Sequence, residues 1–324
     1  MKSPTGTHDS PREPRGRSAT FSVVIPATDG PPTLARCIAA IQASTSAPEE
    51  LIVVETPTAA GPGEARNAGA RRASGDFLVF VDADVEVRPD AFARIRRAFE
   101  GDGELVALFG SYDDDPEHHG LVSDFRNLLH HHVHQLGAGP ATTFWAGLGA
   151  IRRDSFLTLG GFDEERFPHS SIEDIDLGMR LARDGKRILL DPSIQGKHLK
   201  RWTLGSMIRT DLGRRGIPWV RLLLDDRASS DVLNLGLRHR ASAAASVALV
   251  GGLVARKPSV VGAAASVLLA LNASFYTLLF RKRGVRQVAA GFPLHVLHHL
   301  VSVSAVPIAL SQHVLAQTAR NADV

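Results

Sequence analysis

The sequence predicts an α/β domain, in which a mostly parallel sheet is flanked by helices, followed by a hydrophobic helical region. Two observations predict the domain: strand-like and helix-like apolar runs alternate between residues 21 and 110, and one of these runs ends in two carboxylates. A third predicts the helical region, because long stretches after residue 241 are almost free of charge. With 324 residues, the chain can hold one α/β domain of about 200 residues and a further part.

Each element of the domain follows from its apolar pattern. A short continuous apolar run predicts a buried strand, and helical spacing of apolar residues predicts a helix. In chain order we expect a strand over 21–25, a helix over 32–43, a strand over 51–55, a helix over 63–73, a strand over 77–81, a helix over 89–100, a strand over 105–109, a helix over 121–136, a strand over 145–151, a helix over 173–183 and a strand over 187–190. Such alternation favours parallel strands joined by right-handed crossovers.

Composition divides the chain into parts. Residues 1–20 are rich in proline and basic side chains and poor in apolar ones, so we expect a disordered tail. The α/β domain should occupy residues 21–225, and a linker residues 226–240. The single cysteine, Cys37, excludes an internal disulfide and a cysteine-built zinc site, which favours a reducing, cytosolic location for the domain.

Residues 241–318 should form membrane helices. Three stretches, 241–255, 259–280 and 288–316, are almost uncharged and are separated by basic clusters. The cluster between the second and third stretches predicts, by the positive-inside rule, a domain on the cytoplasmic side of the cell's inner (plasma) membrane. A buried soluble helical bundle is the alternative. The chain has a formal charge of +3, but its sequence shows no arginine stripe and no nucleic-acid motif. We therefore expect it to bind phosphate groups and an anionic membrane surface, and not nucleic acid.

Asp82 and Asp84 follow the expected strand over 77–81. Ligands collect at the carboxyl ends of parallel strands, and two alternate carboxylates can share a divalent cation that binds a diphosphate. A strand that simply ends in polar turn residues is the alternative reading.

A resemblance to a known family rests on several motifs in a fixed order. They are Ser-Val-Val-Ile-Pro at 22–26, Leu-Ile-Val-Val-Glu at 51–55, Glu-Ala-Arg-Asn-Ala-Gly-Ala at 64–70, Phe-Val-Asp-Ala-Asp at 80–84, Gly-Gly-Phe-Asp at 160–163 and Glu-Asp-Ile-Asp-Leu at 173–177. This set, which covers residues 21 to about 220, resembles the family 2 glycosyltransferases, in particular membrane-anchored members. The resemblance implies a GT-A type fold, a nucleoside-diphosphate sugar as donor, a Mg or Mn ion, and inversion at the anomeric carbon.

The resemblance also implies roles for the acidic residues. Asp84 is expected to bind the metal directly, and Asp82 to contact the ribose or the metal. Asp174 matches the catalytic base that takes the proton of the acceptor hydroxyl. Glu173 is expected beside it on the acceptor side. Capping of a helix is the alternative role for this acidic pair.

Donor binding is expected from two groups of residues. Arg66 and Asn67 match the donor-binding motif after the second strand, and Pro26, Thr28 and Glu55 stand where the first two strands end. Glu55 replaces the more common paired aspartates, so the nucleotide stays open.

The segment from His198 to Trp202 places an imidazole beside two cations and an indole. His198 is expected to contact the metal or the diphosphate, and Lys200 and Arg201 to stabilise the leaving group. On the acceptor side we expect Trp145, Gly147, Trp202 and Trp219. The histidines of 130–134 are interpreted as a helix face near the acceptor entrance, because the nearby sequence offers no cysteine or acidic pair for a metal site.

The predicted function is therefore transfer of a sugar to the hydroxyl of a membrane-associated, lipid-linked acceptor. Transfer to a soluble glycan or small molecule and a non-catalytic membrane scaffold stay open. A haloacid-dehalogenase phosphatase is disfavoured because Glu86 stands where Thr or Val is expected, and a dinucleotide-binding oxidoreductase because Arg66 replaces the third glycine.

Overall fold

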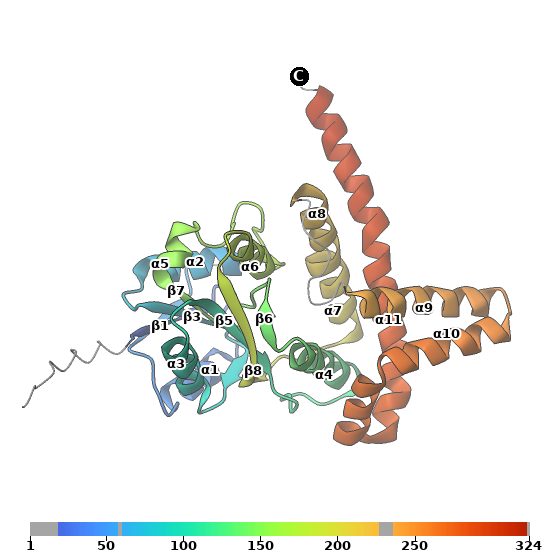
Figure 1. Cartoon of the computed structure of the whole chain (residues 1–324), viewed down its shortest axis with the longest axis horizontal. Coiled ribbons are helices and arrows are strands. Elements are labelled where there is room, and N and C mark those ends of the chain that lie inside the picture. Colours follow the sequence, from blue (N-terminus) through green and yellow to red (C-terminus); the bar gives the residue numbers. More distant parts are fainter. Residues whose placement is uncertain (1–18, 58–59, 227–235, 323–324) are drawn as a thin grey trace, which may run out of the picture.

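The computed structural model describes residues 19–57, 60–226 and 236–322. It shows a sheet with helices on both faces and a group of long helices at the carboxyl-terminal end (Figure 1). The predicted tail lies almost entirely outside the described residues, and so does most of the predicted linker.

Eight strands form one mixed sheet. They are β1 (Phe21–Pro26), β2 (Glu50–Val54), β3 (Phe77–Val81), β4 (Val85–Val87), β5 (Leu105–Tyr112), β6 (Gly139–Ala141), β7 (Leu148–Arg152) and β8 (Arg187–His198). Their order is β2-β1-β3-β7-β5-β8-β4, and β6 pairs with β8. The expected parallel pairing is found among β1, β2 and β3 and between β5 and β8, whereas β7 runs antiparallel to both its neighbours.

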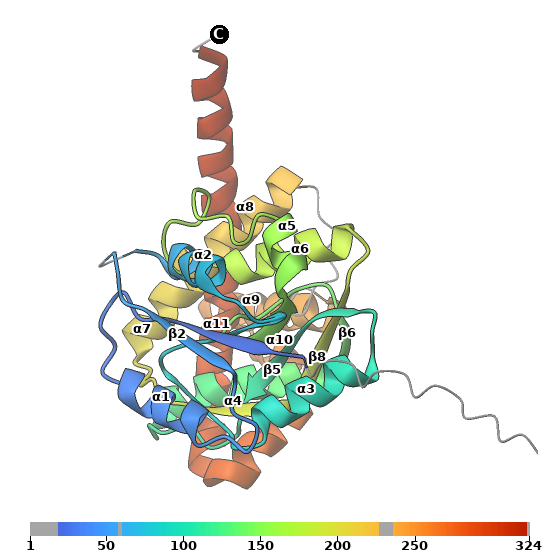
Figure 2. The same ribbon diagram turned by 90° about the vertical axis from the view of Figure 1, so that its left-hand side faces the viewer.

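Helices cover both faces of this sheet. Those of the α/β domain are α1 (Leu34–Gln42), α2 (Pro62–Arg72), α3 (Ala91–Gly101), α4 (Leu121–Leu136), α5 (Arg153–Thr158) and α6 (Glu173–Arg183). Figure 2 shows α2, α5 and α6 on one face, and α1 and α3 on the other. Alternate strand residues face opposite ways, so Val79 packs toward α1 and α3 while Phe80 packs toward α2, α5 and α6. The predicted α/β fold class is thus confirmed.

The chain then forms α7 (Leu204–Arg209), the π-helix η1 (Thr210–Gly216) and α8 (Ile217–Asp226). After the gap come α9 (Leu237–Val254), α10 (Pro258–Leu271) and α11 (Ala273–Ala322). α9 and α10 form a hairpin, and α11 packs against α4, α8, α9 and η1. α11 changes direction at Gly284, whose φ of 74° interrupts the helical backbone.

The second predicted membrane stretch, 259–280, is divided at Asn272 between α10 and α11. Among the described helices, Ala273–Leu315 of α11 is long and apolar enough to cross a membrane, by length and composition. The three predicted crossings therefore stay a prediction.

Close contact between α6 and the loop before β7 fixes the position of α6. A Cβ atom on Gly178 would lie 2.2 Å from the backbone nitrogen of Phe144, and this clash involves backbone that has little freedom to move. We expect Gly178→Ala to lower the free energy of unfolding by about 1–3 kcal/mol. Gly205→Ala in α7 is the control, because nothing lies within 4 Å of its added methyl. Urea unfolding compares the two variants, and equal midpoints would contradict this packing.

Candidate active site

The turn between β3 and β4 presents Asp82 and Asp84. The backbone nitrogen of Asp82 donates to Gly147 at 3.1 Å, and the carbonyl of Asp84 accepts from Leu199 at 2.8 Å. These bonds tie the turn to β7 and to the end of β8. The two carboxylates keep 31% and 29% of their side-chain surface exposed, so they remain accessible to a ligand.

Arg66 joins two of the acidic side chains. Its guanidinium lies 2.6 Å from Asp82 and 2.9 Å from Glu173, so α2, the end of β3 and α6 meet at one buried cation. Burial alone would lower the pKa of Arg66, but the attraction of the two carboxylates outweighs it and raises the pKa. For Asp82, burial outweighs the guanidinium and raises the pKa.

Glu173 and Asp176 are both engaged by other groups. Glu173 accepts from Arg66 and from the backbone nitrogen of Ser171 at 2.9 Å. Asp176 is bound by Arg180 at 2.8 Å. These contacts give both residues a structural task in positioning α6.

Asp174 differs from these neighbours because, within the described residues, no ion pair engages its carboxylate. It accepts from the backbone nitrogens of Ala146 at 3.1 Å and Ile175 at 2.8 Å. Burial, followed by the nearby charge of Glu173, raises the pKa of Asp174 to about 7. A carboxyl with such a pKa can exchange a proton near neutral pH.

His198 connects Asp84 to α4. Residues 85 and 198 face each other where β4 pairs with β8, and the Nε2 atom of His198 lies 3.5 Å from Asp84. Its Nδ1 atom bonds to Asn127, and its ring stacks on Tyr112 with centroids 4.0 Å apart. Burial raises the pKa of Asp84, but its contact with His198 outweighs this and lowers the pKa.

The contact with Asn127 also bears on metal binding. The Asn127 oxygen engages the Nδ1 atom of His198 and orients the ring so that its Nε2 atom faces Asp84, which places the two side chains where they could share a metal ion. In the described part of the chain, no three His, Cys, Asp or Glu side chains are grouped to hold a metal ion by themselves. Asp84 and His198 therefore fit a site whose remaining ligands include substrate oxygens.

One large cavity, of about 970 Å³, connects most of these residues. It includes the predicted residues Arg66, Asp82, Asp84, Trp145, Glu173, Asp174, His198, Lys200, Trp202 and Trp219. Trp145 meets Tyr112 and two histidines edge-on or tilted, and the ammonium of Lys200 lies 4.7 Å from the centre of the Trp202 ring. The tryptophans thus form apolar walls beside the carboxylates.

Other predicted residues do not line this cavity. Pro26, Thr28 and Glu55 lie at the ends of β1 and β2, at the same edge of the sheet as Asp82. The hydroxyl of Thr28 donates to the carbonyl of Ala60 at 2.7 Å, and Glu55 is exposed. Arg201 is also exposed.

Asn67 and Gly147 have structural contacts. The side-chain amide of Asn67 exchanges hydrogen bonds of 2.8 and 2.9 Å with the backbone of Phe162, which fixes the Gly-Gly-Phe turn. Gly147 is required where it stands, because a Cβ there would lie 2.3 Å from the Trp145 ring.

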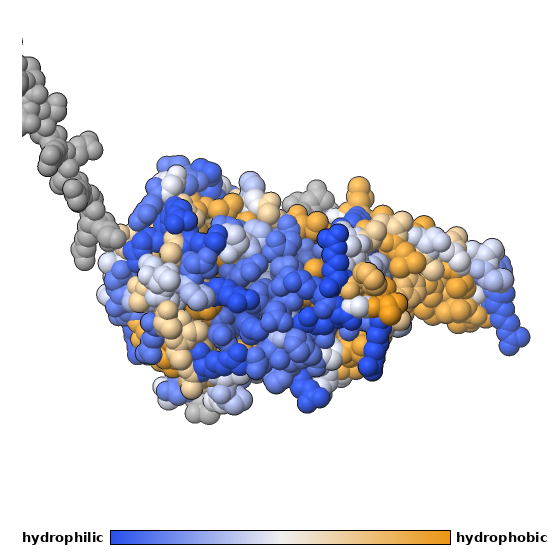
Figure 3. Space-filling model, turned by 90° about the horizontal axis from the view of Figure 1, so that it is seen from below, coloured by the Kyte–Doolittle hydropathy of each residue, from blue (hydrophilic) through white to orange (hydrophobic). Residues whose placement is uncertain are grey.

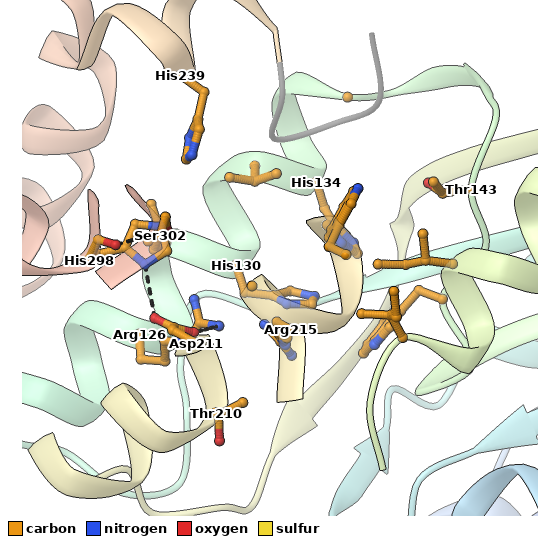
Figure 4. A pocket seen from close by; sticks show the side chains of 18 of the residues that line it. Arg126, His130, His134, Thr143, Thr210, Asp211, Arg215, His239, His298 and Ser302 are labelled. Carbon is orange, nitrogen blue, oxygen red and sulfur yellow. Dashed lines mark hydrogen bonds and ion pairs between the residues drawn. The ribbon is translucent and has the colours of Figure 1, made fainter. Parts of the chain in front are cut away.

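The cavity also includes Arg126 and Asp211, which the sequence did not single out. Arg126 pairs with Asp211 at 2.7 Å, and Asp211 accepts from His298 at 2.9 Å, as Figure 4 shows. Burial alone would raise the pKa of Asp211, but Arg126 and His298 outweigh it and lower the pKa. Because these side chains come from α4, η1 and α11, sequence spacing carries no signal that they meet.

Two histidines of α4, His131 and His134, are hydrogen-bonded to the sheet. The Nδ1 atoms of His131 and His134 bond to the carbonyls of Tyr112 and Gly110 at 2.8 and 2.9 Å. His130 and His134 stand beside Trp145 in the cavity wall. Burial lowers the pKa of His134 to about 4, so this wall is neutral near pH 7.

Comparison with known proteins supports the family resemblance. Residues 47–160 match the family described as Glycosyl transferase family 2. The chain is 29% identical over 141 residues to the O-antigen biosynthesis protein RfbC of Myxococcus xanthus, which covers 38% of this chain and 11% of that protein. It is 25% identical over 143 residues to an uncharacterized glycosyltransferase of Haemophilus influenzae, which covers 41% of this chain and 44% of the relative. The chain thus aligns with less than half the length of either relative.

A solved structure with a similar fold is the mannosyltransferase PcManGT from Pyrobaculum calidifontis in complex with GDP-Man and Mn²⁺. The TM-score is 0.54 at 16% sequence identity, and the superposition covers 91% of this chain and 88% of that one. Residues 47–160 are therefore similar to the Glycosyl transferase family 2 model, and the fold of the chain resembles the GT-A type.

Removal of the Arg66 cation leaves the buried Glu173 and the partly exposed Asp82 without their partner. We expect Arg66→Ala to lower the free energy of unfolding by about 3–5 kcal/mol, as when one member of a buried ion pair is lost. Arg71→Ala, at an exposed position of the same helix, should change it by less than about 0.5 kcal/mol. Urea unfolding at neutral pH measures both, and an Arg66→Ala variant as stable as the control would refute the bridging role.

Proposed function

We propose that this protein is an inverting, metal-dependent glycosyltransferase that transfers a sugar from a nucleoside diphosphate to the hydroxyl of a membrane-associated, lipid-linked acceptor. The observation that carries this proposal is the cavity shared by the Asp84–His198 pair, the Asp174 carboxylate with its raised pKa and the carboxyl-terminal helices. The match of residues 47–160 to Glycosyl transferase family 2 supports the reaction class.

The donor would lie along the ends of β1, β2 and β3. In this proposal Pro26, Thr28, Glu55, Arg66 and Asn67 define the nucleotide side by direct contact or by positioning. Asp82 would face the ribose or the metal. Lys200, which lines the cavity, and Arg201 would add positive charge near the departing diphosphate.

Asp84 and His198 would hold a Mg or Mn ion, with Asp82 close by. When bound, the ion supplies positive charge that stabilises the diphosphate as a leaving group. Asn127 would position His198 through its Nδ1 atom, and the stacked ring of Tyr112 would keep the imidazole in its plane.

Asp174 would act as the base. The acceptor oxygen forms a bond to the anomeric carbon while the bond from that carbon to the diphosphate breaks, and the acceptor proton moves to the Asp174 carboxylate. Glu173 is less suited to act as the base, because Arg66 and the backbone nitrogen of Ser171 donate hydrogen bonds to its oxygens. Displacement on the face opposite the leaving group inverts the anomeric configuration.

The acceptor would approach from the far side of the cavity. Trp145, Trp202 and Trp219 offer apolar surfaces there, and Arg126 and Arg215 offer positive charge. The cavity wall includes residues of α9 and α11, so a lipid-linked acceptor would bind between the domain and these helices. The proposed location is the inner membrane, with the domain in the cytoplasm.

Donor binding tests the metal assignment. UDP-, GDP- and dTDP-sugars are screened with Mn²⁺ or Mg²⁺ for stabilisation of the protein against thermal unfolding. We expect one nucleotide class to raise the unfolding temperature in the presence of metal, and Asp84→Asn to abolish this rise because the neutral amide holds the cation weakly. Asp184→Asn, at the exposed end of α6, is the control. Wild-type donor affinity in Asp84→Asn would remove Asp84 from the metal site.

Transfer to lipid extracts and to soluble glycans then tests the reaction and the acceptor class. For Asp174→Asn we expect normal donor binding and a rate of transfer lower by about 10²–10⁴-fold. The wild-type rate should rise as the pH passes about 7, because the raised pKa keeps Asp174 protonated, and inactive as a base, below that pH. Near-normal transfer by Asp174→Asn would assign the base elsewhere, and donor binding without any transfer would favour a non-catalytic scaffold.

A further inference from the structure

The carboxyl-terminal helices point in two different directions. In Figure 1 the α9–α10 hairpin extends away from the α/β domain, whereas the long part of α11 runs crosswise to the hairpin. This part of α11 packs against η1 and α8. Because their long axes differ in direction, the hairpin and the long part of α11 cannot both cross one flat bilayer. The contacts of each element therefore decide which of them enters the lipid.

α11 is attached to the domain along most of its length. Arg283 contacts Asp124 at 2.8 Å, His298 contacts Asp211 at 2.9 Å, and His313 contacts Asp225 at 3.3 Å. At 1.5 Å per residue these contacts extend over about 45 Å, whereas the hydrocarbon core of a bilayer is about 30 Å thick. If α11 crossed the bilayer, the acidic side chains of η1 and α8 would be drawn into hydrocarbon with it, at a high cost in free energy.

Within the described residues, no such polar contact joins the α9–α10 hairpin to the domain between residues 241 and 271. Between residues 241 and 271 the charged side chains are those of Arg256 and Lys257 at its tip. Small and apolar residues form its inner seam, and a 2.9 Å hydrogen bond between Asn272 and Ser242 closes its base. Its outer surface exposes Val247, Leu253, Val254, Val260, Val267 and Leu269. Figure 3 shows this end of the molecule as largely hydrophobic.

A helix pair that is apolar on all sides is not stable in water alone and favours lipid. α10 has 14 residues and is therefore about 21 Å long, somewhat less than the hydrocarbon thickness. Arg256 and Lys257 could extend from the tip toward the far headgroups. At the base, exposed Arg238 and Arg240 flank His239, which meets His299 of α11, and so are placed to face the near headgroups.

One face of α11 is continuous with the hairpin. Phe292, Val296 and Leu300 pack against it, and the same helical spacing continues to Val303, Val306, Leu310 and Val314, which are exposed. Val303 and Val306 also line the cavity. This uncovered apolar stripe thus lies on the side from which the hairpin projects.

We infer that the hairpin α9–α10 inserts end-on into a lipid bilayer, while α11 lies in the plane of the membrane with its apolar stripe toward the lipid. This inference rests on the proposed membrane association. In this arrangement one inserted hairpin takes the place of the three predicted membrane crossings. The α/β domain and both ends of α11 then lie on the same side of the membrane.

Labelling of single cysteines in the full-length protein tests this topology. The native Cys37 is fully buried, so the unsubstituted chain serves as the unlabelled control. Exposed positions are chosen in the domain, at each end of α11's long part and at the hairpin tip: Glu104→Cys, Arg286→Cys, Gln312→Cys and Lys257→Cys. In sealed, inverted membrane vesicles, we expect an impermeant maleimide to label the first three and not the fourth. Labelling of Arg286→Cys and Gln312→Cys from opposite sides would show that α11 crosses the membrane, and would overturn the inference.

Vesicle flotation separates the insertion of the hairpin from membrane association itself. The full-length protein is mixed with phosphatidylcholine vesicles, with or without phosphatidylglycerol. We expect Val247→Asp to lower binding by about tenfold or more, because a carboxylate is costly in hydrocarbon. Leu157→Asp, at an exposed apolar position of α5, should bind like wild type. Equal binding of both variants would show that the hairpin does not insert, and failure of the wild type to bind would remove the proposed membrane association as well.

Discussion

The buried Arg66 guanidinium is the contact on which the rest of the site depends. Asp82 and Glu173 belong to segments more than 90 residues apart, and both lose solvent when the helices close over the end of the sheet. Two carboxylates in such a place would repel each other without a cation between them. Arg66 removes this repulsion and at the same time occupies Glu173. The adjacent Asp174 has no ion pair among the described residues, and its burial raises its pKa to about 7. A structural ion pair thus distinguishes Glu173 from its neighbour Asp174.

The position of His198 depends on the sheet in a similar way. β4 is short, but its pairing with β8 places residues 85 and 198 opposite each other, so the imidazole and Asp84 move together. Asn127 and Tyr112 then restrict the ring from α4 and β5. Such support from several elements holds the imidazole in one orientation, as a preorganised site requires.

The sequence was sufficient to predict the elements whose patterns are local. The bounds of α4, α6 and β3 match their expected ranges, because each has a clear apolar period and a distinct start or end. Asp84 and Asp174 could be chosen from ordered motifs, and Trp145 as an aromatic surface for the acceptor, and all three line one cavity. Arg126 and Asp211 were missed because they meet only after α4 and η1 pack together, and Asn127 because it reaches His198 only when α4 packs on β8. Hydropathy likewise identified the apolar stretches after residue 241 but contains no information on the directions in which they point.

Val303 and Val306 lie both on the apolar stripe of α11 and in the wall of the cavity. In the proposed arrangement, a hydrophobic acceptor can therefore move sideways from the bilayer to the carboxylates without passing through water. Its encounter with the enzyme becomes a two-dimensional search by lateral diffusion. The relevant concentration is then the mole fraction of acceptor among the lipids, so that added inert lipid slows the reaction even when the amount of acceptor in the sample stays constant.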